Sequence, residues 1–192
     1  MAEAGYKSLV SYKLARIAFD LGWDFVPRYY RKYEDHRQRD QIKQALRSLK
    51  QNIVEGSSER SISSKLKLYD VAKSSGMEAY EDFEDVLRYE KMSRWSKDDF
   101  QLRKLRSIFE GYPYPSNSSI LPHLSVSAVY KVLGLLEGRE GIERVVNYEI
   151  DLLIRCGYLL DKQMNALEEK HAREGGYREK LLNRRLDFRR SH

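Results

Sequence analysis

The amino-acid sequence predicts an all-α protein, an antiparallel four-helix bundle with a helical insertion and a short basic C-terminal helix. Apolar residues recur every three or four positions along four long segments, which is the spacing of a helical face. Only 4 prolines and 11 glycines interrupt the 192 residues, so these helices can be long. Most connections between the long segments are short, which favours antiparallel packing of neighbouring helices.

The first helix is expected from about Gly5 to the low thirties, because apolar residues from Val10 to Leu21 repeat at spacings of four, three and four. Pro27 lies in this stretch and predicts a kink or break, since its ring clashes with the preceding turn. The second helix is expected over about 37–54 and carries one apolar stripe. Gly56 is expected to end this helix as a residue in the left-handed conformation.

The third helix is expected over about 61–92, and its outer face is acidic. A shorter helix should cover about 97–110. Three of the four prolines then fall within 111–123, which predicts a loop. A second short helix is expected over about 125–137. Residues 93–141 therefore form an insertion between the third and fourth long helices.

The last long helix is expected over about 142–173, where apolar residues alternate spacings of four and three, as in the seven-residue repeats of helix bundles. The pair Gly175–Gly176 should end it. Residues 1–174 thus form the bundle domain, and residues 175–192 form a basic suffix with one more short helix.

Positive charge is concentrated at the C-terminus. Residues 170–192 carry +5 of the formal net charge of +6. A local basic excess indicates a surface for polyanions. The suffix residues expected to contact phosphates are Arg178, Arg184, Arg185, Arg189 and Arg190, and those expected to stack on unpaired bases are Tyr177 and Phe188.

A second basic feature lies on the second helix. Arg39, Lys43, Arg47 and Lys50 follow one another at spacings of four, four and three and make one stripe. Two interpretations stay open. The stripe contacts phosphates together with the suffix, or it is a solvated face that makes weak ion pairs with the acidic third helix.

Small and amide side chains occupy another face of the second helix. Gln41, Ala45, Ser48 and Asn52 recur at helical spacing, which favours close packing with satisfied hydrogen bonds over catalysis. Asn52 and Glu55 precede the expected helix end, so we expect them to hydrogen-bond backbone groups left without partners there.

No pattern typical of an enzyme is present. The sequence lacks a phosphate-binding loop, a nucleotide-binding glycine motif and a nucleophile elbow. Glu168 and His171 match one Glu-x-x-His step of di-iron bundles, but such sites need a second step on another helix. Cys156 is better explained as a small buried filler than as a nucleophile. We therefore expect no catalysis, no metal and no cofactor.

The sequence also indicates where the protein acts. No apolar run reaches the length of a membrane span, and the N-terminus lacks the apolar core of a signal peptide. The single cysteine excludes an internal disulfide and fits a reducing compartment. We expect a cytoplasmic location and no membrane partner.

The segment from Gln41 to Gly56, QIKQALRSLKQNIVEG, resembles the hallmark of the four-helix bundle proteins of the 23S rRNA intervening-sequence family. The matching positions are Gln41, Ala45, Ser48, Asn52, Ile53, Glu55 and Gly56. The C-terminal stretches LLDKQ and EGGYREK resemble the subgroup with a four-helix-bundle suffix domain. Relatives include the accessory protein of diversity-generating retroelements. The resemblance implies assembly into a ring of five and binding to nucleic acid and a reverse transcriptase.

The function expected from these observations is a non-catalytic, oligomeric adaptor that binds nucleic acid, RNA rather than DNA, in a ribonucleoprotein or with a reverse transcriptase. The rival is a scaffold for protein–protein interactions that docks partners through the suffix or the insertion. Apolar and aromatic residues exceed what one bundle needs and indicate a subunit interface; they include Trp23, Phe25, Tyr29 and Tyr30.

Overall fold

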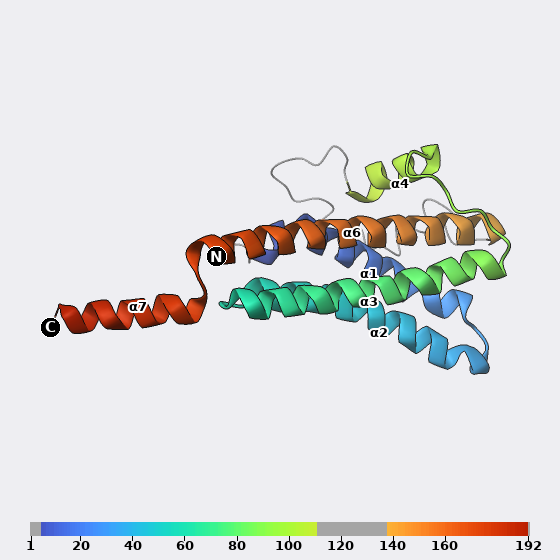
Figure 1. The fold of residues 1–192 in the computed structure, drawn as a ribbon. Helices are drawn as coiled ribbons and strands as arrows, with labels where there is room; N and C mark the ends of the chain where they lie inside the picture. Colours follow the sequence, from blue (N-terminus) through green and yellow to red (C-terminus); the bar gives the residue numbers. More distant parts are fainter. Residues whose placement is uncertain (1–4, 111–137, 192) are drawn as a thin grey trace.

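The computed structural model describes residues 5–110 and 138–191. Within these ranges the secondary structure is helical and contains no strand, so the all-α prediction is confirmed. The four longest helices are α1 (Val10–Tyr29), α2 (His36–Ser58), α3 (Ile62–Tyr89) and α6 (Gly138–Glu174). Figure 1 shows the chain turning back between α1 and α2 and again between α2 and α3.

These four helices enclose one hydrophobic core. Helix α2 packs against α1 and α3, and α6 packs against the same two helices from the other side. The apolar stripe predicted for α2 is buried, with Ile42, Leu46, Leu49 and Ile53 all at most 1% exposed. Burial of one such side chain stabilises the fold by about 1.5–3 kcal/mol, so this stripe is a major part of the core energy.

Three shorter helices and one short projecting helix complete the described chain. Two are 3-10 turns, Gly5–Ser8 before α1 and Tyr33–Asp35 before α2. Helix α4 (Phe100–Glu110) lies along α6, and α7 (Tyr177–Arg190) projects beyond the end of the bundle (Figure 1). The predicted short helix over 97–110 and the basic C-terminal helix are thus present. The loop expected over 111–123 and the helix expected over 125–137 lie outside the described residues.

The ends of α1 differ from the prediction. The helix begins at Val10 instead of near Gly5, because the chain forms a 3-10 turn first. Pro27 lies inside α1 in its last turn, and the helix ends at Tyr29. A proline so close to the C-terminal end removes little of the helical hydrogen-bond ladder, which explains why the helix continues past it.

Gly56 does not end α2, so that prediction is wrong. The helix continues to Ser58, and Gly56 is buried within it. A Cβ atom at this position would lie 2.7 and 2.8 Å from two ring carbons of Tyr69 on α3. The glycine is therefore required because two helices approach closely there, and not because the backbone is left-handed.

Positive φ angles occur at two other glycines. Gly138 (φ 70°) is the first residue of α6, so the fourth long helix begins four residues before the predicted position and the insertion is correspondingly shorter. Gly175 (φ 71°) follows the last residue of α6, and its N–H donates to the His171 carbonyl at 3.0 Å. This end agrees with the prediction, because glycine adopts the left-handed conformation without steric cost.

Most of the aromatic residues expected at a subunit interface belong to the bundle instead. Phe25 is 2% exposed, and its ring stacks on Tyr29 at a centroid distance of 5.6 Å. The Tyr29 hydroxyl donates to Glu90 at 2.8 Å, and Tyr30 is only partly exposed. Trp23 alone of these four is exposed, with 47% of its surface open to solvent.

Most charged residues of the described helices lie on the faces that point away from the core. None of the helices in the described ranges combines the length and the apolar character needed to cross a membrane.

Candidate nucleic-acid interface

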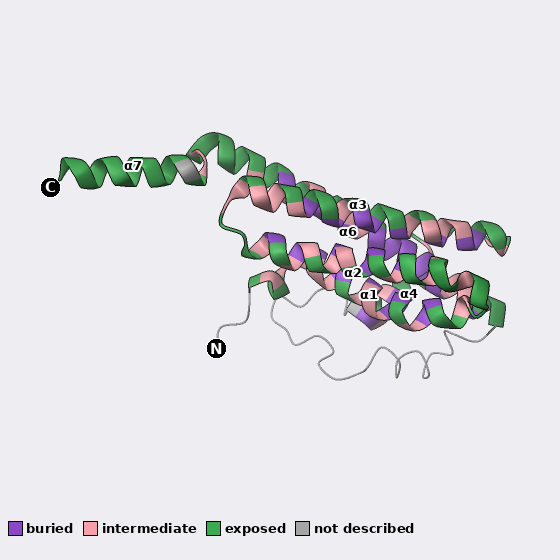
Figure 2. Cartoon of the chain, turned by 90° about the horizontal axis from the view of Figure 1, so that it is seen from below, coloured by how far each residue is buried: buried purple, intermediate pink, exposed green. Residues whose placement is uncertain are grey.

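Helix α7 is held in place at its first turn. The N–H of Gly176 donates to the Glu179 carboxylate at 2.8 Å, which caps the helix, and Lys180 pairs with Glu174 of α6 at 2.7 Å. Beyond this turn, α7 has the colour of exposed residues along its length in Figure 2. The predicted suffix is therefore a helix whose described side chains face solvent. The side chain of Arg178, one of the predicted phosphate contacts, lies outside the described part of the structure.

The positive charge of α7 is largely uncompensated. The helix contains six Lys or Arg residues and two Asp or Glu residues. Within the described residues, the guanidinium groups of four arginines have no ion pair within 4 Å; these are Arg184, Arg185, Arg189 and Arg190. Arg189 and Arg190 also lie in the last helical turn, where the helix dipole favours cations. This charge is available to an external polyanion.

Apolar side chains follow two sides of α7. Tyr177, Leu181 and Phe188 are separated by four and seven positions, which places them on one side of the helix. Leu182 and Leu186 lie on the opposite side. These residues are 39–64% exposed. The two aromatic rings predicted to stack on bases therefore share one face with Leu181. Leu182 and Leu186 form a separate apolar face.

The basic stripe of α2 faces α1. The Lys43 ammonium lies 3.6 Å from the Trp23 ring centroid, and the Lys50 ammonium lies 3.3 Å from the Phe19 ring centroid. Arg39 pairs with its neighbour Asp40 at 3.9 Å. The expected ion pairs with the acidic third helix are thus not formed by these groups. The structure instead brings two residues of the stripe, Lys43 and Lys50, over aromatic rings of α1, an arrangement that favours cation–π attraction.

Arg47 and Lys50 differ in their surroundings. Arg47 is exposed. Burial lowers the pKa of Lys50, and the nearby Asp20 carboxylate acts in the opposite direction. Lys50 therefore remains a cation that is partly withdrawn from water.

The small-residue face of α2 contacts α3. The hydroxyls of Ser48 and Ser75 lie 2.8 Å apart, and the Asn52 amide donates to the Ser48 carbonyl at 2.9 Å and to its hydroxyl at 3.1 Å. Ala45 is buried, whereas Gln41 and Glu55 are exposed.

Asn52 therefore bonds one turn back in its own helix, so the prediction that it bonds to a helix end is wrong. The helix continues past it, and the backbone groups near Asn52 already have helical partners. Glu55 is exposed and also lies before the true end of α2. The structure brings Ser48, Asn52 and Gly56 together at the α3 contact and leaves Gln41 and Glu55 outside it.

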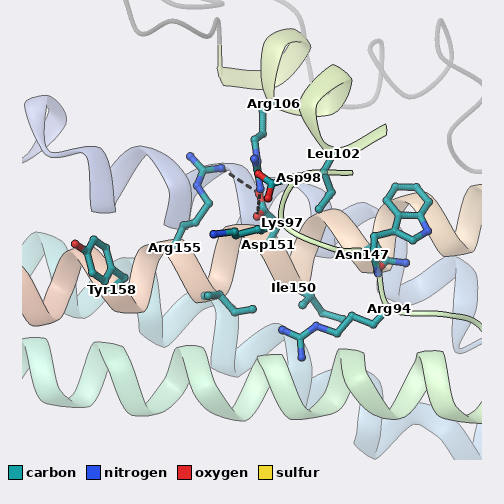
Figure 3. Close-up of a pocket in the computed structure, with 12 residues that line it drawn as sticks. Arg94, Lys97, Asp98, Leu102, Arg106, Asn147, Ile150, Asp151, Arg155 and Tyr158 are labelled. Atoms are coloured by element: carbon teal, nitrogen blue, oxygen red, sulfur yellow. Dashed lines mark hydrogen bonds and ion pairs between the residues drawn. The ribbon is translucent and has the colours of Figure 1, made fainter. Parts of the chain in front are cut away.

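A groove of about 430 Å³ lies between α6 and the segment that leads into α4 (Figure 3). At its base, Asp151 is 7% exposed and accepts hydrogen bonds from Arg106 at 2.9 Å and from Arg155 at 3.1 Å. A buried carboxylate requires such cationic partners to offset its loss of hydration. The pair of Arg106 and Asp151 thus holds α4 against α6, whereas Arg155 supports Asp151 from within α6.

The same segment is fixed one turn earlier along α6. The Trp95 backbone N–H donates to the Asn147 side chain at 2.7 Å, and the Asn147 amide donates to the Ser93 carbonyl at 3.2 Å. Arg94 pairs with Glu84 of α3 at 2.9 Å. Four polar residues of the groove are thus engaged in fixing this segment; they are Arg94, Arg106, Asn147 and Asp151. In the sequence, only the four-residue spacing of Asp151 and Arg155 could have indicated an ion pair here, and that signal is weak.

Two buried ionisable groups lie in α6. Glu149 is 0% exposed, neither of its carboxylate oxygens has a hydrogen-bond partner, and burial raises the pKa of this carboxyl well above its usual value. Burial also raises the pKa of Cys156 to about 12, and its thiol donates to the Ser11 carbonyl at 3.4 Å. Both groups are enclosed by the core. Cys156 is buried, as the filler interpretation requires.

Metal ligands do not converge in the described part of the chain, where no group of three or more His, Cys, Asp or Glu side chains could hold an ion. Glu168 and His171 are both exposed near the end of α6.

Comparison with known proteins finds no matching family model, no matching curated protein and no matching solved structure. The resemblance of the segment from Gln41 to Gly56 to the intervening-sequence family stays a prediction from that motif.

Proposed function

We propose that the protein is a non-catalytic adaptor that binds nucleic acid, RNA in preference to DNA, through α7. The observation that carries the proposal is the set of four α7 arginines that have no ion pair in the described structure, on a helix that projects from the bundle. Arginine suits this role because its planar fork makes paired hydrogen bonds to phosphate. Release of counterions from the nucleic acid would supply most of the affinity.

The aromatic residues of α7 favour single-stranded RNA or DNA over a duplex, and the preference for RNA over DNA rests on the family resemblance. Tyr177 and Phe188 lie on one side of the helix, and flat rings beside cations bind unpaired bases by stacking. Unpaired bases in loops and bulges are the usual target of sequence-reading RNA-binding proteins.

We further propose that copies of the chain assemble into a ring of five, as the family resemblance implies. Several copies of α7 on one assembly would raise the overall affinity by avidity, without any new contact to RNA. The exposed leucines of α7 support contacts with another chain; Leu182 is 55% exposed and Leu181 is 46% exposed.

The same leucines favour a second candidate function, a scaffold that docks protein partners through the suffix. Apolar side chains on an unpacked helix are typical of a helix that binds in a groove of a partner. The reverse transcriptase implied by the family resemblance is a partner that this candidate would also accommodate.

Fluorescence anisotropy with labelled single-stranded RNA and DNA of one sequence tests the main proposal. We expect tighter binding to RNA and a steep loss of binding as salt rises. A variant with Arg184, Arg185, Arg189 and Arg190 changed to Ala should lose most binding while its circular dichroism stays helical.

A control variant removes the same number of charges from exposed positions elsewhere; it changes Lys7, Arg60, Lys67 and Arg103 to Ala. It should bind nearly as the parent does. Equal binding by the α7 variant and the parent would refute the proposal. A protein partner recovered at high salt without nucleic acid, and lost on changing Leu182 and Leu186 to Ser, would instead support the scaffold.

A further inference from the structure

Trp23 is a large aromatic residue that the bundle leaves in solvent. It lies in the second half of α1 and is 47% exposed, although the nearby Phe25 and Val26 are almost completely buried. The core therefore does not account for this indole. Tryptophan with one side packed and one side open is typical of recognition surfaces.

The surroundings of Trp23 are aromatic and cationic. Its ring lies 5.1 Å from the Phe19 ring, with an angle of 34° between the two planes. The ammonium groups of Lys43 and Lys50 each lie over one of these two rings, at 3.6 and 3.3 Å from the centroids. We call this surface the α1–α2 face; it consists of Arg16, Phe19, Trp23, Arg39, Lys43, Arg47 and Lys50.

The charge of the α1–α2 face is positive after its own ion pairs are counted. Arg16 pairs with Asp20 at 3.7 Å, and Arg39 pairs with Asp40. Within the described residues, the remaining three cations, Lys43, Arg47 and Lys50, have no ion pair within 4 Å. A ligand that covers this face must therefore bring negative charge as well as a flat apolar group.

We propose that Trp23 stacks on an unpaired base of single-stranded nucleic acid, with Lys43, Arg47 and Lys50 contacting the phosphates beside that base. This inference rests on the proposed function and adds a second contact surface on the bundle itself. Bases in a duplex already stack on one another, so an indole fixed on a helix reaches only an unpaired base. Two identical positive faces repel each other, which argues against a second copy as the occupant.

Intrinsic fluorescence tests the stacking directly. The chain has two tryptophans, so a Trp95→Phe variant leaves Trp23 as the only indole. We expect single-stranded oligoadenylate to quench its emission, the corresponding duplex to quench it much less, and heparin, a polyanion without bases, to leave it nearly unchanged. If Trp95→Phe disturbs folding, the difference between the parent and a Trp23→Phe variant isolates the same signal.

Binding measurements supply the second readout. Loss of one base–aromatic stack should lower the affinity of a Trp23→Leu variant by about 5- to 150-fold. The Trp23→Phe variant should retain most of the affinity, because it keeps a ring. The dependence of binding on salt should stay the same in both variants, since neither removes a phosphate contact.

The outcomes separate this inference from the proposed function. RNA binding that leaves Trp23 emission and Trp23→Leu affinity unchanged overturns the stacking role but leaves the α7 proposal standing. A change of molecular mass in Trp23→Leu, measured by light scattering without RNA, overturns it in favour of a contact between copies. Absence of any RNA binding by the parent protein removes both proposals.

Discussion

The hydroxyl oxygens of Ser48 on α2 and Ser75 on α3 lie 2.8 Å apart and share one hydrogen bond. The Asn52 amide donates to the same Ser48 hydroxyl, so three side chains form one small network at the contact of the two helices. Ser75 is 7% exposed, which makes an unpaired hydroxyl there costly.

The first prediction concerns this network. Changing Ser48 to Ala should lower the free energy of unfolding by about 1–3 kcal/mol, because the Ser75 hydroxyl is left buried without its partner. The double variant Ser48→Ala with Ser75→Ala should cost less than the two single changes together, since no partner is then left unpaired. Urea unfolding of the four proteins measures the coupling, and strictly additive costs would contradict the hydrogen bond.

The second prediction compares two helical glycines. Changing Gly56 to Ala should lower the free energy of unfolding by about 1–3 kcal/mol, because the new Cβ overlaps the buried Tyr69 ring. A Cβ atom added at Gly157 in α6 would meet no neighbouring side chain or helix within 4 Å, so changing Gly157 to Ala should stabilise the fold by about 0.5–1 kcal/mol. Thermal and urea unfolding check both values, and destabilisation by both changes alike would refute the packing explanation.

The third prediction concerns pH. The unfolded chain releases the Glu149 proton near the usual pKa of 4.5, whereas burial makes the folded chain keep it. The stabilising contribution is therefore complete below the unfolded pKa and falls as pH rises, by about 1.4 kcal/mol per pH unit, until the folded-state pKa is reached.

A Glu149→Gln variant should lose this contribution to the pH dependence and be more stable than the parent at neutral pH and above. The exposed Glu169 provides the matched control, since Glu169→Gln should leave the pH profile unchanged. Urea unfolding of the three proteins, from below the usual glutamate pKa to above neutral pH, measures how the free energy of unfolding depends on pH. Parallel profiles for Glu149→Gln and the parent would show that the carboxyl has a partner.

The fourth prediction uses the single thiol. Cys156 is 1% exposed and its pKa is raised to about 12, so a thiol-specific reagent should react with it only when the core opens. We expect labelling to be fast in denaturant and slow in the native protein, with a rate that follows global stability across the Gly56→Ala and Gly157→Ala variants. Rapid labelling that ignores stability would place the thiol near the surface.

The helices whose apolar residues recur at regular spacing, or whose charge is concentrated, could be predicted from the sequence. The stripe from Ile42 to Ile53 and the suffix helix depend on helical periodicity and on charge, and both are local properties. Gly175 follows the end of α6 as predicted, because its glycine signal coincides with the end of the apolar repeat.

The features that depend on tertiary packing could not be predicted in the same way. Gly56 carries the same glycine signal as Gly175, but its role is set by Tyr69 on another helix. The direction of the α2 basic stripe depends on which neighbour packs beside it, and the partners of Asp151 include Arg106, 45 positions away. The spacing of apolar residues predicts which face of a helix is buried, but it does not predict which other helix packs against that face.

The close contact of Gly56 with Tyr69 has a consequence for the order of folding. Helices α2 and α3 are joined by a very short turn, so their contacts close a small loop, whereas α6 must return from far along the chain. Local contacts with little closure entropy tend to form early in the transition state. We expect Gly56→Ala to slow refolding in stopped-flow experiments, whereas changes on α6, such as Glu149→Gln, act mainly on the unfolding rate.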